Sequence, residues 1–294
     1  MEPLSDATSD EPFDDGPGWV PEEITAHYER EYDEGNRIVE GLGQLELLRT
    51  REILARHLPP APLRILDIGG GTGVHAQWLA QQGHDVLVID PIARHVAQAS
   101  DLASSGLPIS AELGDARSLP VGDATFDAAL LLGPLYHLTT REDRLLALRE
   151  AGRAVRSGGW IFVAAISRFA SLFDGLTGGM LSDPAFLAIV KRDLRDGQHR
   201  NPERRPGWFT TAFFHRPDEL LAEAAAAGYS VVELVGLEGL ACWLPQLEAS
   251  FDNPREREAI LLAARSIETE PSLLGLSAHL LLVARCGSSE KPSS

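Results

Sequence analysis

The stretch Arg-Ile-Leu-Asp-Ile-Gly-Gly-Gly-Thr-Gly, residues 64–73, decides how this chain folds. Its first half, ending at Ile68, is an apolar run of strand length, and its second half is a glycine turn. Val74, Trp78 and Leu79 follow at helical spacing. Strand, glycine turn and helix form the first half of a nucleotide-binding α/β unit. The glycines allow positive φ and leave the turn uncovered, so that a ligand can lie against the amides of the helix start.

Strands and helices continue to alternate beyond this unit, which is typical of a parallel sheet with helices on both faces. The run at 85–90 is almost continuously apolar, as expected of a strand buried on both sides. The strands are expected at 64–68, 85–90, 109–113, 126–132, 160–166, 229–237 and 277–285. The helices are expected at 44–57, at 73–82, after Pro91, from a capping box of Thr139 with Glu142, and at 217–228.

Two long stretches interrupt the alternation, at 167–215 and 238–275. Each contains one expected helix, at 184–195 and 256–267 respectively. Connections of this length usually carry function, so we interpret them as lid insertions. The expected organisation is a disordered acidic N-terminus at 1–20, an N-terminal helical cap at 21–58, a core at 59–286 with these two insertions, and a polar tail at 287–294.

Composition excludes several classes of protein. The 294 residues include 26 Lys and Arg against 43 Asp and Glu, and a net charge of −17 argues against a nucleic-acid partner. No apolar run approaches the ~20 residues of a membrane helix, and the acidic start does not resemble a signal peptide. The two cysteines form no metal pattern. We therefore expect a cytoplasmic monomer or homodimer without a metal or a membrane partner.

Four features fall at the carboxyl ends of successive expected strands, where open α/β sheets bind their ligands. After the glycine turn comes Asp90, 21 residues beyond Gly69, where a carboxylate can accept hydrogen bonds from both ribose hydroxyls. Asp115 follows the third strand and can accept a hydrogen bond from an adenine amino group. The segment 132–138, Leu-Gly-Pro-Leu-Tyr-His-Leu, follows the fourth strand, next to the position of a transferred group.

Together these features resemble the class I S-adenosylmethionine-dependent methyltransferases, in their bacterial small-molecule branch. The glycine motif at 67–73, the ribose-binding acid Asp90, the adenine-side motif at 114–116 and the turn at 156–159 occur in the family's order. The resemblance covers about residues 60–286. It implies a Rossmann-like, mostly parallel sheet of seven strands whose last strand is antiparallel, and S-adenosyl-L-methionine as the cofactor.

The resemblance also implies where the cofactor binds. A segment before the core commonly closes over the cofactor in this family, and residues 32–37, Tyr-Asp-Glu-Gly-Asn-Arg, are similar to such a segment. A surface helix with two half-buried tyrosines is an equally good interpretation of that region. The implied cofactor residues are Asp67, Gly69, Gly71, Gly73, Asp90, Pro91, Asp115, Ala116 and Leu132, together with Tyr28, Tyr32 and Arg37.

The acceptor side is less defined. His137 is a candidate general base because it follows the fourth strand and imidazole titrates near working pH, although a histidine that only packs this loop fits the pattern as well. His215 ends an aromatic stretch and is a second candidate, with a helix-entry role as its alternative. An apolar pocket suits a small organic acceptor. The candidate pocket residues are Tyr136, Trp208, Phe213 and Trp243, with Glu238 beside the last of them.

The sequence therefore predicts an enzyme that transfers a methyl group from S-adenosylmethionine to an oxygen, nitrogen or carbon atom of a small acceptor, such as a secondary metabolite. Alignment in a pocket shielded from water would supply much of the catalysis. Three alternatives remain at this point. They are cyclisation or alkyl transfer with the same cofactor, a non-catalytic subunit, and an NAD(P)-binding oxidoreductase, because Gly71, Gly73 and Ala76 also fit the dinucleotide fingerprint.

Overall fold

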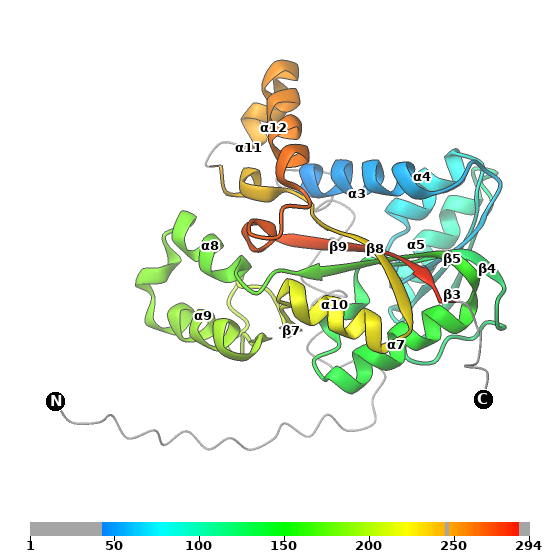
Figure 1. Ribbon diagram of the computed structural model, residues 1–294, viewed down its shortest axis with the longest axis horizontal. Coiled ribbons are helices and arrows are strands. Elements are labelled where there is room, and N and C mark those ends of the chain that lie inside the picture. The colour runs from blue at the N-terminus through cyan, green and yellow to red at the C-terminus, as the bar shows by residue number, and fades with distance from the viewer. Residues whose placement is uncertain (1–42, 245–246, 288–294) are drawn as a thin grey trace.

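A seven-stranded sheet runs through the computed structural model, which describes residues 43–244 and 247–287 (Figure 1). The strand order is β3-β2-β1-β4-β5-β9-β8, with β9 antiparallel to β5 and β8 and the other neighbours parallel. The strands are β1 (Arg64–Ile68), β2 (Asp85–Asp90), β3 (Ile109–Leu113), β4 (Phe126–Leu131), β5 (Val155–Ile166), β8 (Tyr229–Gly236) and β9 (His279–Cys286). The expected fold class, including the antiparallel last strand, is confirmed.

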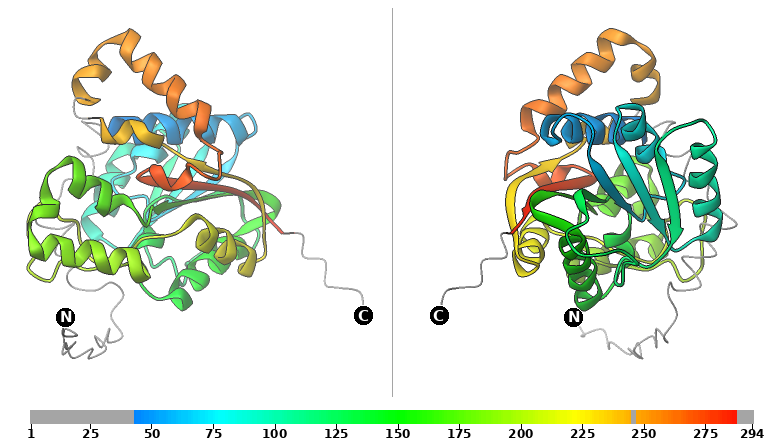
Figure 2. Two further views of the ribbon diagram at one scale, coloured as in Figure 1. Left: turned by 60° about the vertical axis from the view of Figure 1, so that its left-hand side comes forward. Right: turned by 90° about the vertical axis from the view of Figure 1, so that its right-hand side faces the viewer.

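Helices cover both faces of this sheet (Figures 1 and 2). One face packs against α3 (Gly43–His57), α4 (Val74–Gln81) and α5 (Ala93–Ala103), and the other against α7 (Arg141–Ala154) and α10 (Pro217–Ala226). Alternate residues of β1 divide between them, since Ile65 packs on the α3 side and Leu66 on the α7 side. Apolar side chains are therefore needed on both faces, which explains the continuous apolar runs in the sequence.

The start of α7 differs from the prediction by one residue. Thr140, not Thr139, is the N-cap, because its extended backbone lets the hydroxyl oxygen accept the Asp143 N–H at 3.1 Å. The same hydroxyl donates to the Asp143 carboxylate at 3.0 Å, so Asp143 takes the place expected for Glu142. The shift leaves Thr139 in the loop that follows the short helix α6 (Pro134–His137).

The stretch 167–215 is an excursion whose two ends meet. His215 donates its N–H to Ile166 O at 2.8 Å, and Arg168 donates its N–H to His215 O at 2.7 Å. Between them lie α8 (Ala170–Thr177), the 3-10 turn η2 (Met180–Ser182), α9 (Pro184–Asp196) and a small hairpin of β6 (Gln198–His199) with β7 (Ala212–Phe213). The helix expected at 184–195 is α9, whereas α8 and the hairpin are not predicted by periodicity.

The stretch 238–275 packs on α3. It contains η3 (Gly239–Trp243), α11 (Leu247–Asp252), α12 (Pro254–Ile267) and η4 (Leu274–Leu276). Leu45 of α3 forms an apolar cluster with Ala241, Leu247, Phe251 and Ile260. The fully buried Arg49 donates to Leu237 O at 3.1 Å and forms ion pairs with Glu52 and Glu268, which joins α3 to both ends of this stretch. None of the helices that the structure describes is long and apolar enough to cross a bilayer.

Candidate functional site

The glycine turn is tied into the carboxyl edge of the sheet. Gly69, Gly71 and Gly73 have φ values of 65°, 57° and 83°, which favour glycine. The Gly69 N–H donates to Ile89 O at 2.6 Å, so the turn is fixed to β2. A Cβ on Gly69 would lie 2.8 Å from Cδ of Pro134, in the loop after β4. The turn therefore touches the segment where the sequence analysis places the transferred group.

Asp67 lies at the end of β1 beneath this turn and is 1% exposed. A Cβ on Gly70 would lie 2.7 Å from its carboxyl group, so the carboxyl packs directly against the turn backbone. Burial first, and the charge of Asp90 second, raise the pKa of Asp67 to about 7. Among the described residues its Oδ2 has no hydrogen-bond partner. A buried carboxylate oxygen of this kind calls for a donor, and a ligand ammonium group would supply one.

Asp90 joins the glycine turn to the next helix. Its Oδ2 accepts the Gly71 N–H at 2.9 Å, and its Oδ1 accepts the Ile92 N–H at 2.9 Å and lies 3.1 Å from His95 Nδ1. The carboxylate is 4% exposed. Because each carboxylate oxygen can accept two hydrogen bonds, Oδ2 keeps capacity for a ligand hydroxyl. His95 lies one helical turn beyond Pro91, where no sequence motif predicts a contact with Asp90.

Asp115 follows β3 as expected, but its carboxylate is already engaged. It accepts the Arg117 N–H at 2.7 Å and the Arg117 guanidinium through Nη2 at 2.7 Å. These hydrogen bonds, ahead of the opposing effect of burial, raise the pKa of Arg117. An adenine amino group would have to share Asp115 with this arginine. The sequence contains a signal for this contact, since the side chain of an arginine two residues after an acidic residue can fold back and pair with it.

The loop after β4 lies against the glycine turn and contacts the 167–215 excursion. A Cβ on Gly133 would lie 3.2 Å from Gly69 O and 3.7 Å from the Tyr136 hydroxyl oxygen. His137 Nδ1 lies 3.4 Å from Thr211 O, and its ring stacks on Phe209 with 6.0 Å between centroids. An aromatic group of Tyr136, His137 and Phe209 therefore stands next to the turn.

His215 is fully buried at the point where the 167–215 excursion returns to β5. Its Nε2 lies 3.2 Å from Glu223 Oε2, and burial, ahead of the raising effect of Glu223, lowers its pKa. Burial opposes ionisation of Glu223, but hydrogen bonds from His215 and Arg144 outweigh it and lower the Glu223 pKa to about 2. Arg144 donates to Glu223 at 2.7 and 3.0 Å and lies 3.6 Å above the Phe213 ring. This placement favours the helix-entry role of His215 over the role of base.

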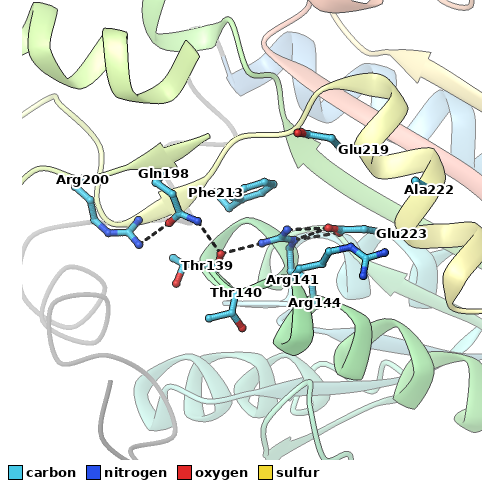
Figure 3. A pocket seen from close by; sticks show the side chains of 10 residues that line it. All are labelled: Thr139, Thr140, Arg141, Arg144, Gln198, Arg200, Phe213, Glu219, Ala222 and Glu223. Carbon is cyan, nitrogen blue, oxygen red and sulfur yellow. Dashed lines mark hydrogen bonds and ion pairs between the residues drawn. The ribbon is translucent and has the colours of Figure 1, made fainter. Parts of the chain in front are cut away.

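A cavity of about 580 Å³ opens between the hairpin and the starts of α7 and α10 (Figure 3). Most of the residues that line it are polar or charged: Gln198 Nε2 donates to Thr139 O at 3.0 Å, and Arg200 donates to Gln198 Oε1 at 2.7 Å. The lining residues are Thr139, Thr140, Arg141, Arg144, Gln198, Arg200, Phe213, Glu219, Ala222 and Glu223. Phe213 is the residue of the predicted pocket that lies on this cavity.

Two predicted pocket residues serve as packing groups within the excursions. Trp208 contacts the Phe186 ring at 5.0 Å, with the Arg205 guanidinium 4.5 Å from its ring centroid. Trp243 donates its indole N–H to Leu276 O at 2.6 Å and contacts the Phe173 ring at 5.5 Å. The Phe173–Trp243 contact joins the two excursions, which the sequence analysis treated separately.

Comparison with known proteins agrees with this arrangement. Residues 65–159 match the family model of a methyltransferase domain. A ubiquinone biosynthesis O-methyltransferase of Azorhizobium caulinodans is 32% identical over 196 residues, which cover 64% of this chain and 70% of that protein. The chain belongs to the class I S-adenosylmethionine-dependent methyltransferases. It is an enzyme that uses S-adenosylmethionine to methylate a small organic acceptor.

Solved structures place this methyltransferase in the same fold. An S-adenosylmethionine-dependent methyltransferase from Mesorhizobium loti aligns with a TM-score of 0.56 and 19% identity over 82% of this chain and 99% of the other. The [4+2]-cyclase SpnF aligns with a TM-score of 0.51 and 20% identity over 82% and 81% of the two chains. At these identities the likeness concerns the fold alone. The sequence relative favours methyl transfer over the cyclase and oxidoreductase alternatives.

The residues of this methyltransferase fit its cofactor on three observations. The glycine turn is a cradle that side chains would fill, Asp67 offers a buried acceptor without a partner among the described residues, and Asp90 keeps acceptor capacity at the next strand end. Tyr28, Tyr32 and Arg37 lie outside the described residues, as do the cap before residue 43 and the tail after residue 287. The cofactor roles of the individual residues remain predictions.

Proposed function

We propose that this methyltransferase acts on a hydroxyl oxygen of a small ring-bearing acceptor. The observation that carries the proposal is the contact between the glycine turn and the loop after β4. It sets Tyr136, His137 and Phe209 beside the cofactor cradle, and aromatic rings give a flat apolar acceptor a surface to stack on. The name of the relative from Azorhizobium caulinodans supports oxygen as the accepting atom.

The proposal assigns roles along the carboxyl edge. The cofactor would lie on the turn at 69–73, with its ammonium group toward Asp67, its ribose toward Asp90 and its adenine between Asp115 and Ala116. Pro91 and Leu132 would flank it, and Tyr28, Tyr32 and Arg37 would close over it. The bound cofactor supplies an electrophilic methyl group on a sulfonium centre. The chain itself binds, aligns and shields the two reactants.

Residues 21–58, 167–215 and 238–275 would together form the cover over the acceptor. The contact between Phe173 and Trp243, which links the second and third of these segments, supports a common cover. The net charge of −17 supports a small molecule rather than a nucleic acid as the partner. We expect a cytoplasmic protein that is a monomer or a homodimer, and light scattering coupled to size exclusion measures its oligomeric state.

The test of the proposed function uses S-adenosylmethionine labelled with ¹³C on the methyl group. The purified chain is incubated with catechol, hydroquinone and 4-hydroxybenzoate, and in parallel with aniline and indole. We expect S-adenosylhomocysteine together with a ¹³C-methoxy product from at least one phenol. A labelled N-methyl or C-methyl product without a methoxy product would refute oxygen as the acceptor. Release of methylthioadenosine would refute methyl transfer itself.

A further inference from the structure

A buried carboxylate holds a histidine where the carboxyl end of β5 meets the amino end of β9. Glu238 Oε1 lies 2.6 Å from His279 Nδ1. Glu238 Oε2 accepts the Ser277 hydroxyl at 2.6 Å and the His279 backbone N–H at 3.0 Å. Ser277 is in turn fixed, because its oxygen accepts the N–H of Glu238 at 3.0 Å. Glu238 is 2% exposed and Ser277 is fully buried.

This arrangement sets the tautomer of the histidine. A carboxylate facing Nδ1 at 2.6 Å requires Nδ1 to carry the proton, which leaves Nε2 as the basic nitrogen. The same carboxylate stabilises the imidazolium that forms when Nε2 takes up a proton, as in the histidine of a catalytic triad. The His279 side chain is 22% exposed, whereas the Glu238 side chain is 2% exposed. The imidazole is therefore more exposed than the carboxylate that holds it.

The position of His279 suits an acceptor next to the cofactor. It pairs with Ile166, the last residue of β5, and β5 pairs with β4, whose following loop touches the glycine turn. Two strand spacings separate β9 from β4, which is about 10 Å and the span of a small aromatic acceptor. Leu281 and Val283 of the same strand pack on the α3 side, so His279 points to that side too.

Among the described residues, other ionisable groups near the ring come from α3 and η3. Glu46 in the first turn of α3 places its Oε2 3.9 Å from His279 Nδ1. Cys242 of η3 has its pKa raised by burial and then by the charge of Glu238, so it remains a neutral thiol. Arg49, one turn along α3 from Glu46, donates hydrogen bonds to Glu52, Glu268 and Leu237 O. Within the described residues, the carboxylates of Glu46 and Glu238 thus both face the imidazole.

We propose that His279, oriented by Glu238, is the general base that removes the proton of the acceptor hydroxyl. The step rests on the proposed O-methyl transfer. The acceptor O–H proton passes to His279 Nε2, a C–O bond forms to the methyl carbon, and the C–S bond breaks with its electron pair returning to sulfur. S-adenosylhomocysteine and the methyl ether leave, and the imidazolium gives its proton to water. Glu238 is a positioning residue that never touches the acceptor.

The two earlier histidine candidates are less suited to this step. His137 Nδ1 lies 3.4 Å from a neutral carbonyl, Thr211 O, which compensates an imidazolium less than a carboxylate does. His215 is fully buried and shares Glu223 with Arg144, which already neutralises that carboxylate. Glu46, Glu238 and His279 also form a group whose potential metal-ligand atoms lie within 4.8 Å of one another. The 2.6 Å contact is about as short as a charge-assisted N–H···O hydrogen bond, which favours a proton over a metal ion between Glu238 and His279.

The kinetic test compares His279→Gln and Glu238→Gln with a control, His84→Gln. His84 lies in the turn between α4 and β2, outside every segment assigned to the cofactor or to the cover. We expect His279→Gln to lower kcat at neutral pH by about 100-fold or more while the KM for S-adenosylmethionine changes less than about threefold. Glu238→Gln should lower kcat by about 10-fold and move the acid limb of the pH–rate profile to lower pH. The control should keep the wild-type profile.

Three results would overturn the proposal. The first is an unchanged kcat and pH profile in His279→Gln. The second is a wild-type rate that is lost on chelation with EDTA and restored by Zn²⁺ or Mg²⁺, because the same side chains would then hold a metal. The third comes from ¹⁵N spectra of histidine-labelled protein bound to S-adenosylhomocysteine, with the His279 signal assigned by its loss in His279→Gln. A neutral ring with the proton on Nε2, or a signal unaffected by Glu238→Gln, contradicts the dyad.

These outcomes distinguish a failure of the His279–Glu238 pair from a failure of the proposed function. If amines rather than phenols are methylated, the oxygen assignment fails, and the same variants test proton removal from the amine. If no acceptor is methylated, the proposed function fails, and the ¹⁵N spectra still decide the state of the ring. Binding of S-adenosylhomocysteine at wild-type affinity shows that a slow variant is folded. Glu238→Gln serves as the second variant if His279→Gln does not fold.

Discussion

The cofactor half of this enzyme and its acceptor half are built in different ways. Around the glycine turn, the contacts join backbone groups to side chains a few residues away or at the next strand end, as Asp90 does with Gly71 and Ile92. On the acceptor side, charged side chains meet across long stretches of sequence, as in the Arg144–Glu223 pair, 79 residues apart. The first half depends on local geometry, and the second on a network that only the folded chain assembles.

The largest effect should follow a break in the acceptor-half network. Glu223→Ala leaves the buried Arg144 without its carboxylate, and we expect a loss of about 3–5 kcal/mol in the free energy of unfolding. Urea unfolding measures it, with Glu258→Ala, an exposed partner of Arg265, as the control. Affinity of the folded protein for S-adenosylhomocysteine should change less than about threefold. A large fall in that affinity would mean that the two halves are not separate.

The next effect should come from Asp90→Asn. Both carboxylate oxygens accept backbone N–H groups, so the new amide must turn its own NH₂ toward one of them. Losing a charged hydrogen bond costs about 1.5–3 kcal/mol, and we expect affinity for S-adenosylhomocysteine to fall about 10- to 100-fold by calorimetry. Asp85→Asn, at the exposed start of the same strand, is the control. Equal affinities of the two variants would refute the role of Asp90.

A smaller effect is expected from Gly69→Ala. The left-handed backbone costs a residue with a Cβ about 1–2 kcal/mol, and the new methyl group would also press on Pro134. We expect about a 10-fold loss of affinity for S-adenosylhomocysteine. Gly106→Ala has the same kind of strain at φ 82° but meets no atom within 4 Å. It should leave the affinity unchanged, which isolates the contact between the turn and the loop after β4.

The smallest expected effect is a pH dependence centred on Asp67. Its pKa is raised from 3.8 to about 7, so the stability that its protonated form contributes is present at low pH and is lost as pH rises through that interval. A ligand ammonium group reverses this preference for protonated Asp67, because it forms an ion pair only with the ionised carboxylate. Between pH 6 and pH 7, affinity for S-adenosylhomocysteine should therefore rise by about fivefold, in step with the ionised fraction of Asp67. Calorimetry on Asp67→Asn should show a flat profile.

The sequence predicts the cofactor half well because each feature there depends on a short window. The glycine turn, the strand β2 and the acid that ends it follow from periodicity and turn chemistry, and the structure has them at the expected residues. The cap of α7 is one residue off because two threonines adjoin and only the backbone conformation of Thr140 selects it. The ion pair of Arg117 with Asp115 is not predictable from the sequence, because the arginine side chain contacts Asp115 rather than solvent only in the folded loop.

The sequence by itself determined the α/β class, the edge of the sheet at which the cofactor is expected and the acidic residues along that edge. Each of these depends on strand periodicity, glycine φ angles or helix starts, which are set within a few residues. Tertiary structure alone decided the acceptor side. It buried His215, opened the cavity beside Phe213 and set Glu238 against His279, 41 residues further along the chain. No periodicity links such partners, because their meeting depends on which strands pair and on where a long excursion returns to the sheet.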